Sequence, residues 1–124
     1  MGPYAGHRDA VFADWKQQMQ QIAALPNVFV KLGGLGMSVF GFPFHTRATP
    51  PTSRELAEAW GPYILTCIDL FGPERCMFES NFPVDKGSCS YQVLWNTFKR
   101  ITQGMSADEK RHLYHDTAQR FYRL

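Results

Sequence analysis

Side chains that can do acid–base chemistry gather between residues 79 and 85. Glu79, Ser80 and Asn81 follow the apolar run at residues 76–78 directly, and Asp85 comes shortly after them. A carboxylate can take a proton from an attacking water, whereas the amide of Asn81 can only hydrogen-bond a substrate or orient that water. We therefore take Glu79, Asn81 and Asp85 as candidate catalytic residues and Ser80 as a candidate substrate contact.

A β-strand near residues 75–80 is expected to position these groups. The turn signal Gly72-Pro73 precedes the apolar run, and Phe82-Pro83 must end regular pairing because proline has no N–H for a ladder. Ser88 is a candidate N-cap, and a helical pattern follows. A strand, a polar loop and a helix form the βα unit of an α/β barrel, whose chemistry lies at the C-terminal strand ends. On such a strand Glu79 and Asn81 would point the same way.

A second strand is expected near residues 27–32, and Lys31 interrupts its apolar run. Lys31 is either a substrate contact at the strand end or a partner for Glu79 on the adjacent strand. Asp85 also has an ordinary alternative, which is to pair with Lys86 or to cap the following helix. Three glycines between residues 33 and 36 permit close backbone approach, but their spacing matches no phosphate-binding pattern.

Residues 37–51 form a long loop rich in aromatic side chains, with His45 and Arg47 near its middle. Both are candidate substrate-binding residues, since arginine can grip a carboxylate with two parallel hydrogen bonds. Three hypotheses stay open for the loop: an ordered lid over an apolar pocket, a patch covered by a missing partner, or a surface loop with ordinary polar decoration.

Apolar periodicity predicts helices from Asp9 to about Leu25, from about Ser53 to Phe71, from Ser90 to about Thr102, and from Ser106 to the end of the chain. Gly61-Pro62 is expected to kink or split the second of these helices. Residues 1–6 are expected to be loop. The order α-β-α-β-α-α fits parallel βα units.

Composition narrows the function classes. The chain has 124 residues and is 44% hydrophobic, which predicts a single unit over residues 1–124 with a sizeable core. A net charge of +2 without a basic block argues against a nucleic-acid partner, and no apolar run approaches the ~20 residues of a membrane span. Three cysteines without CxxC spacing indicate reduced thiols, as in a cytoplasmic protein.

The stretch from Cys76 to Pro83 resembles the last-strand motif of the amidohydrolase superfamily. The similarity is to its branch of TIM-barrel metal-dependent hydrolases, which includes lactonases. That motif has an arginine, two or three apolar residues, Gly-Ser-Asp, an aromatic residue and proline. Its aspartate is the general base and, in metal-bound members, a ligand. Asn81 stands at that position here and Glu79 replaces the glycine. Residues 30–34, Val-Lys-Leu-Gly-Gly, are similar to another strand of the family.

The resemblance implies an α/β fold that is the C-terminal half of a (β/α)8 TIM barrel, because a complete barrel takes ~250 residues. It implies a hydrolase that cleaves a C–O or C–N bond of a small lactone, ester or amide. It also implies a divalent metal, zinc, in the complete family barrel. The chain lacks the family's His-x-His motif and is expected to begin just downstream of another family histidine, so no metal ligand is assigned.

Two hypotheses follow from this resemblance. In the first, the chain acts on a small-molecule substrate once the missing barrel half, or a second copy, completes the site. In the second, the chain is a non-catalytic half-barrel remnant that self-associates, because a partial sheet leaves edges open to pairing.

Overall fold

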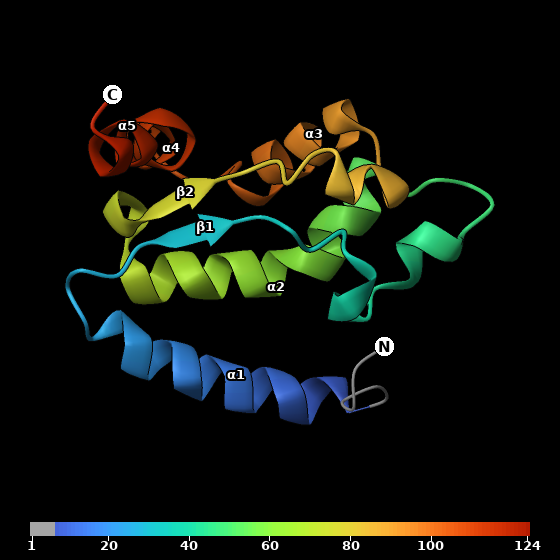
Figure 1. The fold of residues 1–124 in the computed structure, drawn as a ribbon, viewed down its shortest axis with the longest axis horizontal. Coiled ribbons are helices and arrows are strands. Elements are labelled where there is room, and N and C mark those ends of the chain that lie inside the picture. Colours follow the sequence, from blue (N-terminus) through green and yellow to red (C-terminus); the bar gives the residue numbers. More distant parts are fainter. Residues whose placement is uncertain (1–6) are drawn as a thin grey trace.

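The computed structural model describes residues 7–124, and the loop expected at residues 1–6 lies outside them. Two short strands lie side by side in the centre of the molecule (Figure 1). Helices α1 and α2 lie below them in this view, and α3, α4 and α5 lie above. The helix bounds are α1 Arg8–Ala23, α2 Ser53–Phe71, α3 Tyr91–Ile101, α4 Ala107–Arg111 and α5 Thr117–Tyr122, with a π-helical turn at His112–Asp116 between α4 and α5.

The sheet pairs β1, Val30–Leu32, with β2, Cys76–Phe78, in parallel. Both strands are shorter than the predicted ranges 27–32 and 75–80. Turns precede each strand, and neither Glu79 nor any residue after it continues β2. Leu32 lies opposite Phe78, and both side chains are buried in the core. Because side chains alternate along a strand, Lys31 and its neighbour Met77 point to the other face.

Helix α2 supplies most of the core that lies against the strands. Thr52 and Glu55 form a reciprocal capping box at its start. Leu56, Trp60 and Ile64 recur at four-residue steps and are fully or almost fully buried. The helix continues through Pro62, so the predicted split at this point is absent.

Helix α3 begins after Ser90, whose side chain accepts a hydrogen bond from the Val93 N–H. Ser90, and not Ser88, is therefore its N-cap. Phe98 on this helix stacks on Phe78 of β2, with ring centroids 4.4 Å apart. The C-terminal helices begin at a capping box that Ser106 forms with Glu109.

Helix α1 packs on the outside of α2 and has no fully buried residue. Its Trp15 contacts Tyr63 of α2, with ring centroids 5.2 Å apart. Arg75, just before β2, holds the end of α1 through the carbonyl oxygens of Ala23 and Leu25, at 3.0 and 2.9 Å, and also bonds the Phe71 carbonyl. One guanidinium thus ties α1 to the end of α2.

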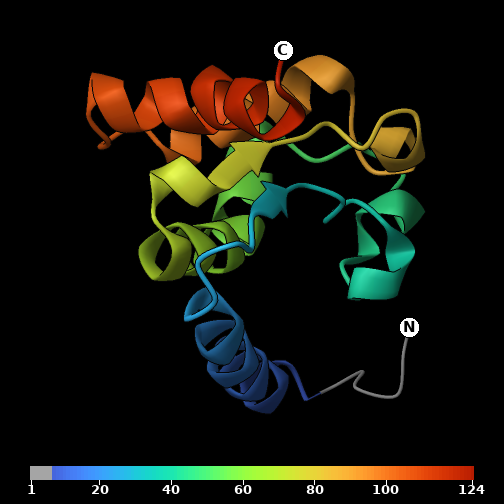
Figure 2. The same ribbon diagram turned by 60° about the vertical axis from the view of Figure 1, so that its left-hand side comes forward.

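Both strands point toward the same side of the molecule. The turns at residues 38–40, 43–46 and 84–87 gather there, as the two views show (Figures 1 and 2). The candidate residues of the sequence analysis therefore lie at the carboxyl ends of the strands. The helices within residues 7–124 are all too short or too polar to cross a membrane.

Candidate functional site at the strand ends

An ion pair joins the two strands where they end. The Lys31 ammonium contacts the Glu79 carboxylate, and the two side chains are 51% and 27% exposed. The hydrogen bond from Lys31 to Glu79, supported by their charge attraction, raises the pKa of Lys31. Of the two hypotheses for Lys31, the structure shows the pairing with Glu79. Both groups remain open to solvent at the strand end.

Glycines bring the loop after β1 against the residues after β2. A Cβ atom at Gly33 would lie 2.5 Å from both the carbonyl oxygen and Cγ of Glu79. A Cβ atom at Gly36 would lie 2.8 Å from Cγ of Asp85. Both distances are shorter than any real Cβ contact, so only glycine allows this approach. The glycines after β1 therefore allow this loop to pack directly against the residues that follow β2.

Asn81 lies outside the strand, contrary to the expectation that it shares a strand face with Glu79. The strand ends at Phe78, and Asn81 has a left-handed backbone with φ of 51°. Asparagine is one of the few residues that adopt this conformation readily, because its side chain can bond locally. The Asn81 side chain is half-buried, and its Nδ2 donates to Asp85 Oδ1 at 2.8 Å.

Asp85 is fully buried and is the centre of the junction between the two loops. Its Oδ2 accepts the Gly36 N–H at 3.2 Å, while Oδ1 accepts from Asn81. Burial raises the pKa of Asp85, and the hydrogen bonds from Asn81 and Gly36 partly offset that effect. Its carboxylate neither pairs with Lys86 nor caps α3. With no exposed surface, its carboxylate is closed off from solvent in this arrangement.

Ser80 and Ser88 complete the junction in different ways. Ser80 Oγ accepts the Phe82 N–H at 3.3 Å, which is a local turn contact. Ser88 is buried, and its hydroxyl donates to the Gly36 carbonyl at 2.6 Å. Sequence reasoning did not find the roles of Gly36 and Ser88. Their bond joins residues 52 positions apart, and no local pattern signals such a pair.

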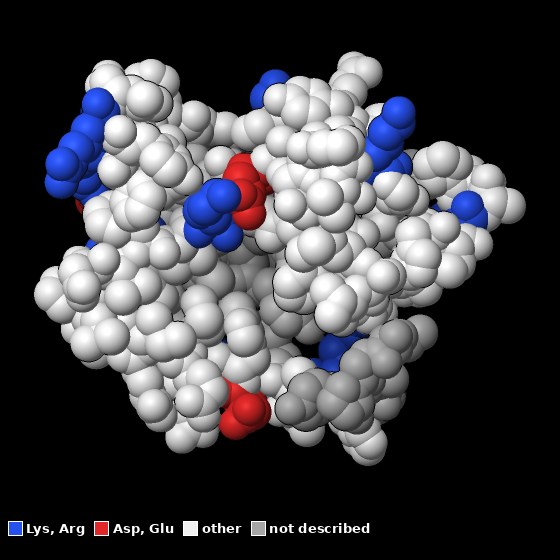
Figure 3. Space-filling model, in the orientation of Figure 1, with Lys and Arg blue, Asp and Glu red and all other residues white. Residues whose placement is uncertain are grey.

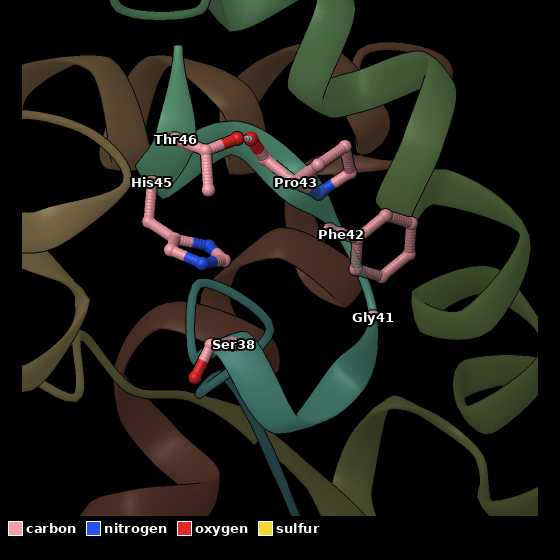
Figure 4. A pocket seen from close by; sticks show the side chains of 6 residues that line it. All are labelled: Ser38, Gly41, Phe42, Pro43, His45 and Thr46. Carbon is pink, nitrogen blue, oxygen red and sulfur yellow. Dashed lines mark hydrogen bonds between the residues drawn. The ribbon is translucent and has the colours of Figure 1, made fainter. Parts of the chain in front are cut away.

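His45 lies in the loop between β1 and α2, where it lines a small cavity of about 220 Å³. Its ring extends toward the turn that carries Ser38, as Figure 4 shows, while the Phe42 ring points away from it. Phe42 is buried and meets Trp60 of α2 edge-on. The loop is thus anchored to the core by an aromatic side chain and presents His45 to solvent.

Arg47 is already paired. Its guanidinium contacts the Glu55 carboxylate at 2.8 Å, and both side chains are partly exposed. Within residues 7–124, no hydrogen bond or ion pair links Arg47 or His45 to Glu79 or Asn81. The structure therefore brings together Lys31, Glu79, Asn81 and Asp85, and it leaves the two loop residues apart from them.

The residues at the strand ends do not form a metal centre by themselves. Over residues 7–124, no three His, Cys, Asp or Glu side chains are grouped so as to hold a metal ion. Both oxygens of Asp85 face N–H donors, and the Lys31 ammonium lies against Glu79. A zinc ion at this end of the sheet would need ligands from outside the described residues.

Charge is spread thinly over the face that carries the strands. Lys and Arg side chains are scattered over it, and one of them lies beside an acidic group near the centre (Figure 3). Most of this face is uncharged.

Comparisons with known proteins find a matching family model and two characterised relatives of this chain. The family model described as Amidohydrolase matches residues 1–124. The chain is 31% identical to an L-fucono-1,5-lactonase of Burkholderia multivorans, over 94% of the chain and 37% of that protein. It is 30% identical to an L-rhamnono-gamma-lactonase of Scheffersomyces stipitis, over 91% of the chain and 34% of that protein. The chain thus spans little more than a third of these relatives.

A solved structure shows the same arrangement of elements. It is the crystal structure of an amidohydrolase from Burkholderia multivorans with bound zinc, which superposes with a TM-score of 0.78 at 31% identity. The match covers 94% of this chain and 39% of that one. The mixed helix and sheet structure with a parallel strand pair is therefore consistent with part of a barrel.

Proposed function

We propose, because the chain belongs to the amidohydrolase family, that it carries one part of the active site of a hydrolase that opens lactones of sugar acids. One observation supports this most directly. The carboxyl ends of two parallel strands bring Lys31, Glu79 and Asn81 to one edge, where barrel enzymes place their chemistry. The two lactonases similar to this chain supply the substrate class.

Glu79 is the proposed general base. It has the carboxylate that remains partly exposed at this edge, whereas Asp85 is fully buried. In the reaction, water attacks the lactone carbonyl and Glu79 takes the proton. The ring C–O bond then breaks, and the proton passes to the leaving alkoxide oxygen, which gives the hydroxy acid. Lys31 holds Glu79 in place, and Asn81 binds a substrate hydroxyl or the water.

His45 and Arg47, the remaining candidate residues, have supporting roles in this proposal. His45 is a proposed contact for the hydroxyl-bearing part of the substrate, because it lines a cavity and is exposed. Arg47 can reach a substrate only by leaving Glu55. The rest of the barrel, from outside the described residues or from a second copy, would close the site over the sheet face that carries Lys31.

The test is hydrolysis of L-fucono-1,5-lactone and L-rhamnono-gamma-lactone by the purified chain, followed by base uptake at constant pH. We expect hydrolysis above the spontaneous rate, and a loss of about 100-fold or more in Glu79→Gln, as is usual for a missing general base. Glu58→Gln is the matched control, because Glu58 is exposed on α2. Equal rates for wild type and Glu79→Gln, both above the spontaneous rate, would contradict the assigned base.

The second candidate function is a non-catalytic unit that self-associates. Within residues 7–124, each strand pairs on one side only, which leaves two sheet edges open. Val39, Phe40 and Val84 add exposed apolar surface at 65%, 49% and 61%. Light scattering combined with the hydrolysis assay on the same sample separates the two candidates. An assembly that hydrolyses the lactones supports a completed site, and an assembly that does not supports the second function.

A further inference from the structure

We infer that Asp85 is a positioning residue that decides which atom Asn81 presents at the end of β2. Its carboxylate holds the Nδ2 of Asn81, so the carbonyl oxygen Oδ1 is the atom left for a ligand. The ligand class is therefore a hydrogen-bond donor, such as a substrate hydroxyl or a water. The inference rests on the proposed function only where it takes the ligand of Asn81 to be a substrate hydroxyl or the attacking water.

The chemistry of the two side chains assigns the orientation. An ionised carboxylate accepts hydrogen bonds and donates none, so the atom of Asn81 that lies 2.8 Å from Asp85 Oδ1 must be the NH2 nitrogen. The other carboxylate oxygen faces a second donor, the Gly36 N–H. With a donor on each oxygen, the charged form of Asp85 is the one that this junction accommodates.

Backbone hydrogen bonds also hold Asp85 in place. Its N–H donates to the Asn81 carbonyl at 3.1 Å, and its own carbonyl accepts the N–H groups of Ser88 and Cys89 at 3.0 and 3.2 Å. Because its side chain is fully buried and also bound to Gly36 of the other loop, the carboxylate has no room to swing. Asn81 is thus oriented by a fixed group.

A neutral residue at position 85 would reverse this orientation. In Asp85→Asn, the new amide oxygen is needed by the Gly36 N–H, which leaves its NH2 group facing Asn81. The Asn81 amide must then turn over to offer its oxygen to residue 85, and its NH2 group points outward. The group that Asn81 presents outward thus changes from a hydrogen-bond acceptor to a donor, while the side chain at position 85 keeps its size.

The test is NMR spectroscopy of the labelled full chain in which the Asn81 side-chain amide is assigned. In the wild type, we expect two separate Hδ2 resonances with nuclear Overhauser contacts to the Asp85 Hβ protons. In Asp85→Asn, we expect the pattern of these contacts to change and the Hδ2 resonances to move toward solvent-exposed values. Ser88→Ala is the matched control, because it removes the bond to the Gly36 carbonyl in the same junction but leaves Asn81 untouched.

Three outcomes would overturn the inference: wild-type Hδ2 protons without contacts to Asp85, an unchanged Asn81 amide in Asp85→Asn, or an equal change in Ser88→Ala. The last would mean that any loosening of the junction reorients Asn81. If Asp85→Asn does not fold, the wild-type contacts still decide the orientation. No turnover is measured, so a chain without lactonase activity would refute the proposed function and leave this inference standing.

Discussion

Gly33 shows how closely the two loops approach at the level of single residues. Gly33→Ala would place a methyl group against both the backbone oxygen and Cγ of Glu79, so one loop must shift. We expect the free energy of unfolding to fall by about 1–3 kcal/mol, the usual cost of overpacking. Urea denaturation followed by circular dichroism measures it. Gly104→Ala is the control, because a Cβ atom there meets nothing within 4 Å. Equal midpoints for the two variants would contradict the close approach.

Glu55 predicts a pH dependence of stability. The Thr52 backbone N–H, with Arg47 and the Thr52 hydroxyl, lowers the pKa of Glu55 from 4.5 to about 2. Because the folded pKa lies below the unfolded one, the stabilisation is present above about pH 4.5 and is lost as the pH falls toward 2. The midpoint of urea denaturation should therefore be higher for the wild type than for Glu55→Gln near neutral pH. The difference between the two midpoints should shrink as the pH falls.

The same urea titrations on Glu58→Gln provide the comparison for Glu55. Glu58 is exposed on the same helix and takes no part in the capping box. A gap between wild type and Glu55→Gln that stays constant from neutral pH down to about pH 3 would show that the capping box does not respond to the charge of Glu55.

At the scale of elements, Arg75 is expected to control how α1 docks. Lysine at this position keeps the charge but cannot reach three carbonyls with a planar fork. We expect Arg75→Lys to lower the free energy of unfolding by about 1–3 kcal/mol, as for partly buried acceptors left without partners. Hydrogen exchange should quicken in α1 before other elements, since α1 has no fully buried residue. Arg54→Lys, at an exposed position of α2, should change neither the free energy of unfolding nor the exchange rates. Hydrogen exchange that quickens equally in all elements of Arg75→Lys would contradict a specific role of Arg75 in docking α1.

Local chemistry made most elements predictable. Apolar periodicity marked the extent of the helices, and the starts expected at about Ser53 and at Ser106 agree with the capping boxes of Thr52 with Glu55 and of Ser106 with Glu109. The strands were overestimated in different ways. Val28 and Phe29 extend the apolar run before β1 without pairing, whereas the range expected for β2 included the flanking polar residues Arg75, Glu79 and Ser80. The grouping of Lys31 with Glu79 followed from adjacent parallel strands. The bond from Gly36 to Asp85 did not, because it depends on how two distant loops fold against each other.

For the whole molecule, the three cysteines report on global unfolding. Burial raises the pKa of Cys67 and Cys89 to about 11 and that of Cys76 to about 12. A thiol reacts as its thiolate, so all three should react slowly with Ellman's reagent near pH 8 in the folded protein. All three should react fast in denaturant. One thiol that reacts fast before unfolding would show that its part of the core opens separately.

The left-handed backbone at Asn81 also limits what evolution can place there. A φ of 51° is comfortable for glycine, asparagine and aspartate and is costly for branched or bulky side chains. Of these three, only the amide and the carboxylate can take part in chemistry, and they differ by a single group of nearly equal size. The backbone at this position therefore suits either side chain, but an aspartate would bring a second carboxylate against Asp85 Oδ1 in place of the Asn81 NH2 donor. A change from asparagine to a carboxylate at position 81 would therefore require a matching change at Asp85, so the two positions are expected to vary together.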